Sequence, residues 1–108
     1  MSAPPDDFLA FLEAQRREYG AQLPARVAAL EALWAAVRAP GGAAQLPELE
    51  RAAHSLAGSA GTFGFVQMGA ASKALEMALQ RFGSAHGAPA AVESALSAVH
   101  SALAAKPS

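Results

Sequence analysis

Residues 24–42 read PARVAALEALWAAVRAPGG and hold the most regular helical pattern in the chain. Apolar residues recur every three or four positions, which is the spacing of one face of an α-helix. Pro24 suits the first turn of such a helix, and the Pro-Gly-Gly sequence at residues 40–42 ends it. The stretch therefore predicts an amphipathic helix over residues 24–39, with a buried face made of Val27, Leu30, Leu33, Trp34 and Val37.

The rest of the chain has the same kind of helix start and stop signals. Alanine, the best helix former, is the most common residue, and no segment alternates between apolar and polar residues for long. Strands are therefore not predicted, whereas prolines and glycines mark where helices begin and end. The predicted helices cover residues 5–19, 24–39, 47–61, 67–82 and 90–104.

Each predicted helix has one apolar stripe. The first predicted helix begins with Asp6 and Asp7 and ends at Gly20. The negative charges of the two aspartates stabilise the positive N-terminal end of the helix dipole. Its stripe is Phe8, Phe11, Leu12, Gln15 and Tyr19. The stripes of the last three helices are Leu49, Ala53, Leu56 and Ala60; Met68, Ala71, Leu75, Ala78, Leu79 and Phe82; and Val92, Leu96, Val99 and Leu103.

The connections between these helices are short, and short connections place consecutive helices antiparallel. We therefore expect an all-α fold, an antiparallel up-and-down four-helix bundle with an additional N-terminal helix packed across or alongside it. Its length fits a single domain over residues 1–108. The complete helices at both ends favour a free-standing protein over a domain excised from a longer chain.

Composition and charge exclude several classes of protein. The net charge is −1 and the eight Lys and Arg residues are scattered, so no basic surface for nucleic acid is expected. No stretch approaches the ~20 apolar residues of a membrane span. The absence of cysteine excludes disulfides, thiolate zinc sites and cysteine nucleophiles. The acidic, proline-rich N-terminus is unlike a secretory signal. We expect a cytoplasmic monomer.

One histidine departs from the pattern of the helix over residues 47–61. His54 lies about 140° from Leu49 and about 160° from Leu56 around a helix, so it points into solvent. Gly58 follows on the same face, although glycine inside a helix costs about 1 kcal/mol relative to alanine. Such a bare surface would let the active site of another protein reach the imidazole. Neutral imidazole is a good nucleophile near pH 7, which fits a phosphoryl acceptor.

The sequence around this histidine carries a family resemblance. Residues 53–64, AHSLAGSAGTFG, resemble the signature of the histidine-containing phosphotransfer (HPt) domain: a His, a Leu two residues on, a Gly four residues on and a turn Gly ten residues on. The pairs Leu23-Pro24 and Leu75-Glu76 also resemble the family. The similarity extends loosely over residues 8–104.

The resemblance implies a four-helix bundle that carries a phosphoryl group between aspartates of response-regulator receiver domains, or from a histidine kinase or hybrid kinase. The acceptor atom corresponds to Nε2 of His54. Family members hold the other ring nitrogen with a Gln or Glu about 22 residues on, which corresponds to Glu76. We expect Lys73, one turn earlier, to neutralise phosphoryl oxygens. The resemblance implies no kinase activity and no cofactor in this chain, and Mg²⁺ only on the receiver.

The expected docking surface is flat because its side chains are small. It consists of Arg51, Ala57, Gly58, Gly61 and Ser72, beside Lys73. Many family members carry Lys three residues after the histidine, where this chain has Ala57. Arg51 or Lys73 compensates for the lost charge, or the receiver supplies all of it, or transfer is slower.

Two other functions stay open at this point. The first is an HPt-like adaptor that binds a receiver or kinase without being phosphorylated, which Ala57 favours. The second is an unrelated structural bundle that oligomerises through its alanine-rich faces. His86 and His100 are expected to have no chemical role, and no metal site is predicted because the His spacings fit none. Gly61 and Gly64 are expected in a turn that needs positive φ.

Overall fold

The computed structural model describes residues 5–106, and the side chains of residues 7–106. The expected charge of Asp6 and the ends of the predicted domain, at residues 1–4 and 107–108, lie outside the described part. The helices are α1 (Pro5–Arg38), α2 (Leu46–Thr62), α3 (Val66–Gly83) and α4 (Pro89–Ser101), with short 3₁₀ helices η1 (Gly42–Gln45) and η2 (Ala102–Ala104). Residues 5–106 contain no strand, and the predicted all-α bundle is confirmed.

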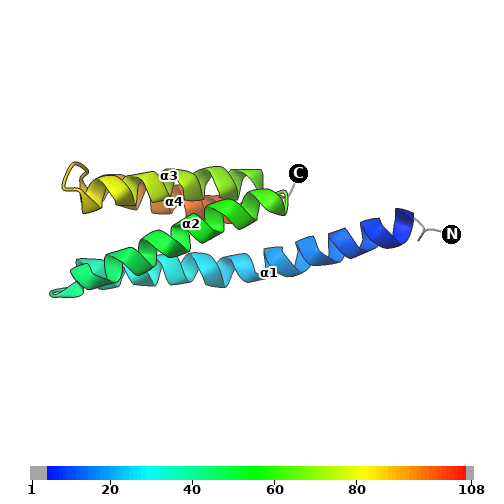
Figure 1. The fold of residues 1–108 in the computed structure, drawn as a ribbon, viewed down its shortest axis with the longest axis horizontal. Helices are drawn as coiled ribbons and strands as arrows, with labels where there is room; N and C mark the ends of the chain where they lie inside the picture. Colours follow the sequence, from blue (N-terminus) through cyan, green and yellow to red (C-terminus); the bar gives the residue numbers. More distant parts are fainter. Residues whose placement is uncertain (1–4, 107–108) are drawn as a thin grey trace.

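The four helices run antiparallel, each next to its neighbour in sequence (Figure 1). Gly41 and Gly64 adopt positive φ, of 75° and 84°, in the connections after α1 and after α2. The prediction of positive φ was correct for Gly64 and wrong for Gly61, which remains inside α2. The close approach of the two helices depends on Gly69 of α3, because a Cβ atom on Gly69 would lie 3.4 Å from the Gly61 nitrogen.

The predicted division of residues 5–39 into two helices is wrong, because α1 continues through Gly20 and Pro24. Gly20 lacks a side chain where Phe65 packs: a Cβ atom there would lie 2.9 Å from the Phe65 Cζ atom. Pro24 removes one backbone hydrogen bond, which costs about 3 kcal/mol. Leu23 and Val27 are buried on either side of it, and each contributes roughly 1.5–3 kcal/mol. Burial therefore offsets the proline.

The additional N-terminal helix is thus the first part of α1, and it projects beyond the ends of the other helices (Figure 1). The molecule is 60 Å long and about 20 Å across. The predicted burial of the first stripe holds for Tyr19 and is wrong for Phe8, Phe11 and Leu12, which are exposed. The other helices end before they reach these three side chains.

The core lies among the four helices. Most residues of the apolar stripes predicted for residues 24–39, 47–61, 67–82 and 90–104 are buried. The ring of Trp34 meets the ring of Phe82 edge-on, with centroids 5.2 Å apart. At the opposite end of the bundle, Tyr19 stacks on Phe63 with centroids 4.5 Å apart. Besides the aromatic rings, the predicted stripe residues that the helices bury in this core are Val27, Leu30, Val37, Leu49, Ala53, Leu56, Ala60, Met68, Leu75, Leu79, Val92, Leu96 and Val99.

Candidate functional site

His54 lies on the outer face of α2, with 74% of its side chain exposed. Its Nδ1 atom is 2.6 Å from Oε2 of Glu76, which comes from the facing side of α3. The carboxylate can only accept while it is ionised, so Nδ1 carries the proton and donates it. The lone pair of this tautomer is on Nε2. No hydrogen bond within residues 7–106 involves Nε2, which leaves it available as a nucleophile.

Glu76 is buried, with 8% of its side chain exposed, yet both of its oxygens have partners. Oε1 accepts a hydrogen bond from Nζ of Lys73 at 3.3 Å. Burial raises the pKa of Glu76, but the hydrogen bonds from His54 and Lys73 and their charges lower it by more, so the pKa lies below its ordinary value. The carboxylate is therefore ionised at neutral pH and stays an acceptor.

A shallow pocket of about 260 Å³ surrounds these groups. A Cβ atom on Gly58 or on Gly61 would meet nothing within 4 Å, so neither glycine is needed there for packing inside the domain. Because Gly58 and Gly61 have no side chains, the approach to the imidazole is open. The pocket is lined by His54, Ala57, Gly58, Lys73 and Glu76.

The sequence model of the Hpt domain family matches residues 14–106. The chain belongs to the Hpt domain family. Hpt domains take part in histidine phosphotransfer in phosphorelays, together with kinases and response regulators. Neither a curated protein nor a solved structure matches the chain significantly. None of the helices in residues 5–106 combines the length and apolar character needed to cross a membrane.

One residue predicted on the docking surface of the Hpt domain is wrongly placed. Ser72 is completely buried and its hydroxyl has no hydrogen-bond partner. The stripe of α3 runs through Met68, Ser72 and Leu75, whereas the prediction used position 71, one residue away around the helix. Arg51, Gly58 and Gly61 are exposed as expected, and Ala57 is half-buried.

The sequence reasoning missed a polar cluster beside His54, where α1 packs against α2. The hydroxyls of Tyr19 and Ser59 are 2.6 Å apart. The guanidinium of Arg26 donates to Ser59 at 3.3 Å and to Ser55 at 3.4 Å, and it lies 5.5 Å from the centre of the Tyr19 ring. Ser55 and Ser59, four residues apart on one face of α2, were the available signal. The cluster fixes α1 against the helix that carries His54.

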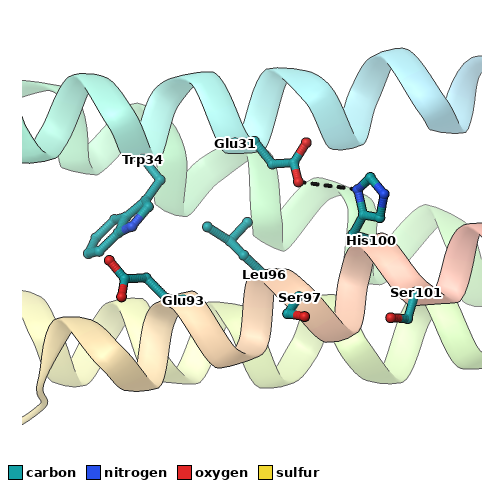
Figure 2. A pocket seen from close by; sticks show the side chains of 7 residues that line it. All are labelled: Glu31, Trp34, Glu93, Leu96, Ser97, His100 and Ser101. Carbon is teal, nitrogen blue, oxygen red and sulfur yellow. Dashed lines mark ion pairs between the residues drawn. The ribbon is translucent and has the colours of Figure 1, made fainter.

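The other histidines lie elsewhere. His86 contacts the Ser84 carbonyl oxygen through Nδ1 at 2.8 Å. His100 on α4 pairs with Glu31 on α1 at 3.2 Å, across a pocket of about 460 Å³ that also includes Trp34 (Figure 2). This pocket is larger than the one at His54, but both groups of its ion pair are exposed. Within the described residues, no group of three or more metal-ligating side chains could hold a metal ion.

Proposed function

We propose that this Hpt domain accepts a phosphoryl group on Nε2 of His54 and passes it to or from an aspartate of a receiver domain. The contact of 2.6 Å between His54 and Glu76 carries the proposal, because it fixes the tautomer that frees Nε2. The family match supports the same reaction class. The cytoplasmic location expected from the sequence stays a prediction.

The transfer step can be written for the receiver's aspartyl phosphate as donor. The lone pair of Nε2 attacks phosphorus and forms an N–P bond. The P–O bond to the aspartate breaks, and the carboxylate leaves with the bonding electron pair. The ring becomes a cation that keeps its proton on Nδ1, where the Glu76 carboxylate stabilises it.

The groups that would assist this transfer step are the cations and the bare surface around His54, together with what the receiver brings. Lys73 would turn from Glu76 toward the phosphoryl oxygens, since its ammonium group is exposed. Arg51, one turn before His54, is exposed on the same helix and offers a second cation. The receiver would supply Mg²⁺ and the acidic pocket. Gly58 and Gly61 would let the receiver approach the imidazole closely.

Phosphoramidate tests the acceptor without any protein partner. Intact mass should show a phosphoryl adduct that is lost in acid on the wild-type protein, and none on His54→Ala. The matched control is His86→Ala, which removes an exposed histidine outside the site and should leave the adduct unchanged. An adduct that persists in His54→Ala would contradict the proposal.

The adaptor is the second candidate function, because Ala57 stands where many family members carry Lys. If missing charge limits the reaction, Ala57→Lys should accelerate phosphorylation several-fold, since a fixed cation stabilises the charge that develops on the phosphoryl oxygens. The control is Ala90→Lys on α4, which adds the same charge at an exposed position. A wild-type protein that binds a receiver tightly but exchanges no phosphoryl group with it would favour the adaptor.

A further inference from the structure

Arg26, on the side of α1 that packs against α2, is a half-buried cation without an acidic partner in the described part of the chain. Its guanidinium has five N–H donors. The hydrogen bonds that it makes within residues 7–106 go to the hydroxyls of Ser59 and Ser55. No carboxylate of residues 7–106 forms an ion pair with it. The described residues therefore leave its charge unneutralised and some of its donors free.

The helix segments around Arg26 form a surface of one sign of charge. Residues 19–30 of α1 and 51–62 of α2 lie side by side, since Tyr19 and Arg26 contact Ser59. Their only lysine, arginine, aspartate or glutamate residues are Arg26 and Arg51. Many of the other residues are alanine or glycine. The surface on the α1 side of His54 is therefore positive and carries few large side chains.

Helical geometry shows what the guanidinium can reach. Ser55 and Ser59 lie about 100° and 140° around α2 from His54, and the midpoint between them is about 4.5 Å farther along the axis. Because Arg26 contacts both serines, its charge is on the order of 10 Å from the imidazole. A direct hydrogen bond spans only about 3 Å. Arg26 is thus too far away to contact a phosphoryl group on Nε2.

A protein docked over His54 would nevertheless cover Arg26. Even a small transient interface buries ~500 Å² of each partner, which corresponds to a disc with a radius of about 13 Å. An interface centred on His54 therefore extends across α2 onto α1. A guanidinium that loses its water in such an interface needs an acceptor, because an unpaired charge is costly to bury. The partner must supply that acceptor.

We infer that Arg26 is a docking residue for the receiver domain, a role that rests on the proposed phosphotransfer. Its guanidinium would bind a carboxylate at the rim of the receiver's phosphorylated site. A surface that holds Mg²⁺ beside an aspartate carries carboxylates, because Mg²⁺ takes oxygen ligands. The docking surface thus extends from α2 and α3 onto α1. Arg26 acts on the affinity for the receiver and on its salt dependence, and not on the transfer step.

The polar cluster holds the guanidinium in place before a partner binds. The guanidinium lies 5.5 Å from the centre of the Tyr19 ring, and the Tyr19 hydroxyl is 2.6 Å from that of Ser59. A side chain that is already held loses less conformational entropy on binding than a free one. The cluster therefore favours association as well as the packing of α1 against α2.

Transfer from protein labelled with phosphoramidate tests this role. The probe is the receiver domain that accepts the phosphoryl group fastest in a panel of purified receiver domains, and the rate is measured against its concentration. Arg26→Gln should raise the half-saturating concentration about fivefold to tenfold at low salt and change the limiting rate less than about twofold. The difference should disappear at 1 M salt, where charges are screened beyond about 3 Å. Arg26→Lys, which keeps the charge, should recover part of the affinity.

Arg38→Gln is the matched control. Arg38 also belongs to α1 and also lies over an aromatic ring, 5.7 Å from the centre of Trp34. It is twelve residues, or about 18 Å, farther along the helix, outside the docked area. The substitution changes the net charge by the same amount and should leave the half-saturating concentration unchanged. Equal effects of the two substitutions would show that only the overall charge matters, which overturns the role of Arg26.

A second pair of variants tests the charge without removing any contact of the cluster. Ala29 is exposed and lines a small pocket together with Arg26 and Ser55. Ala29→Glu should therefore offset the positive charge and raise the half-saturating concentration. Ala28 is also exposed, but it lies about 160° from Arg26 around the helix, so Ala28→Glu should have no such effect. An unchanged affinity in Ala29→Glu would contradict the docking role.

Labelling of His54 separates this role from the proposed function. Phosphoramidate should label Arg26→Gln at the wild-type rate. Slower labelling together with a lower limiting rate of transfer would mean that Arg26 supports the structure of the site, and would overturn the docking role. If the labelled wild-type protein passes its phosphoryl group to no receiver, the proposed function fails and the docking role fails with it. If transfer occurs with equal half-saturating concentrations for the wild type and Arg26→Gln, only the docking role fails.

Discussion

Nδ1 of His54 lies 2.6 Å from Oε2 of Glu76, and this contact joins α2 to α3 at the surface of the bundle. The two side chains differ sharply in environment, because most of the imidazole is exposed whereas the carboxylate is buried. The ring is thus held by one nitrogen from inside the protein and presents the other to solvent. Burial also keeps water from competing for the carboxylate, which strengthens the contact.

Removal of the Glu76 carboxylate should slow phosphorylation of His54. A hydrogen bond to a charged group contributes about 1.5–3 kcal/mol, so Glu76→Ala should lower the rate with phosphoramidate by roughly tenfold to a hundredfold. Nitrogen NMR of the ring should show a mixture of tautomers in place of the Nδ1–H form. Glu76→Gln should restore part of the rate, because its amide oxygen still accepts. An unchanged rate in Glu76→Ala would remove Glu76 from the mechanism.

The same carboxylate makes stability depend on pH. The pKa of Glu76 in the folded protein lies below its ordinary value of 4.5, so in acid the unfolded chain binds more protons than the folded one. The resulting stabilisation is present above about pH 4.5 and is lost as the pH falls through the folded value. The difference in urea stability between the wild type and Glu76→Gln should therefore shrink below pH 4.5. A trend of the same size in Glu93→Gln, at an exposed position on α4, would contradict this role of Glu76.

A bulky residue at position 58 should block a protein partner but not a small donor. Since a Cβ atom on Gly58 meets nothing within 4 Å, Gly58→Leu should fold normally and keep its helical circular dichroism. Labelling by phosphoramidate should continue, while transfer from a phosphorylated receiver should fall at least tenfold. Gly58→Ala is the control for helix propensity, and it should raise the free energy of unfolding by about 1 kcal/mol. Rapid transfer by Gly58→Leu would place the docking surface elsewhere.

Replacing the proline inside α1 should stabilise the protein. Pro24 is exposed and cannot donate to the Gly20 carbonyl, so Pro24→Ala should restore that hydrogen bond and raise the free energy of unfolding by about 1–3 kcal/mol. For a domain of this size, each kcal/mol raises Tm by roughly 4–8 °C. Pro89→Ala is the matched control, since Pro89 occupies the first turn of α4, where no backbone donor is needed. A lower stability of Pro24→Ala would refute this account of α1.

The sequence was informative wherever periodicity and tertiary packing agree. The stripes of α2 and α4 and the exposure of His54 followed from helical phase, and Glu76 from its spacing in the family resemblance. Gly20 and Pro24 misled because burial of Leu23 and Val27 outweighs local propensity. Phe8 misled for a different reason: an apolar stripe indicates which face is apolar and does not say whether another helix extends far enough to cover it.

Ser72 and the Arg26 cluster show a further limit. The stripe of α3 contains several alanines and a serine, so apolarity alone did not separate position 71 from position 72. The contacts of Arg26 with Ser55 and Ser59 depend on the angle at which α1 crosses α2. That angle is a property of the whole bundle, and no short motif encodes it.

The shared carboxylate of Glu76 has a consequence for the direction of transfer. The charge of Glu76 balances that of Lys73, and the tautomer of His54 with its proton on Nδ1 and its lone pair on Nε2 adds none. In the proposed transfer, the phosphoryl group would bring about two negative charges, but the ring would become positive on accepting it, so the net charge of the site would change by only about one unit. A site whose charge changes so little adds only a small electrostatic cost to the proposed transfer in either direction.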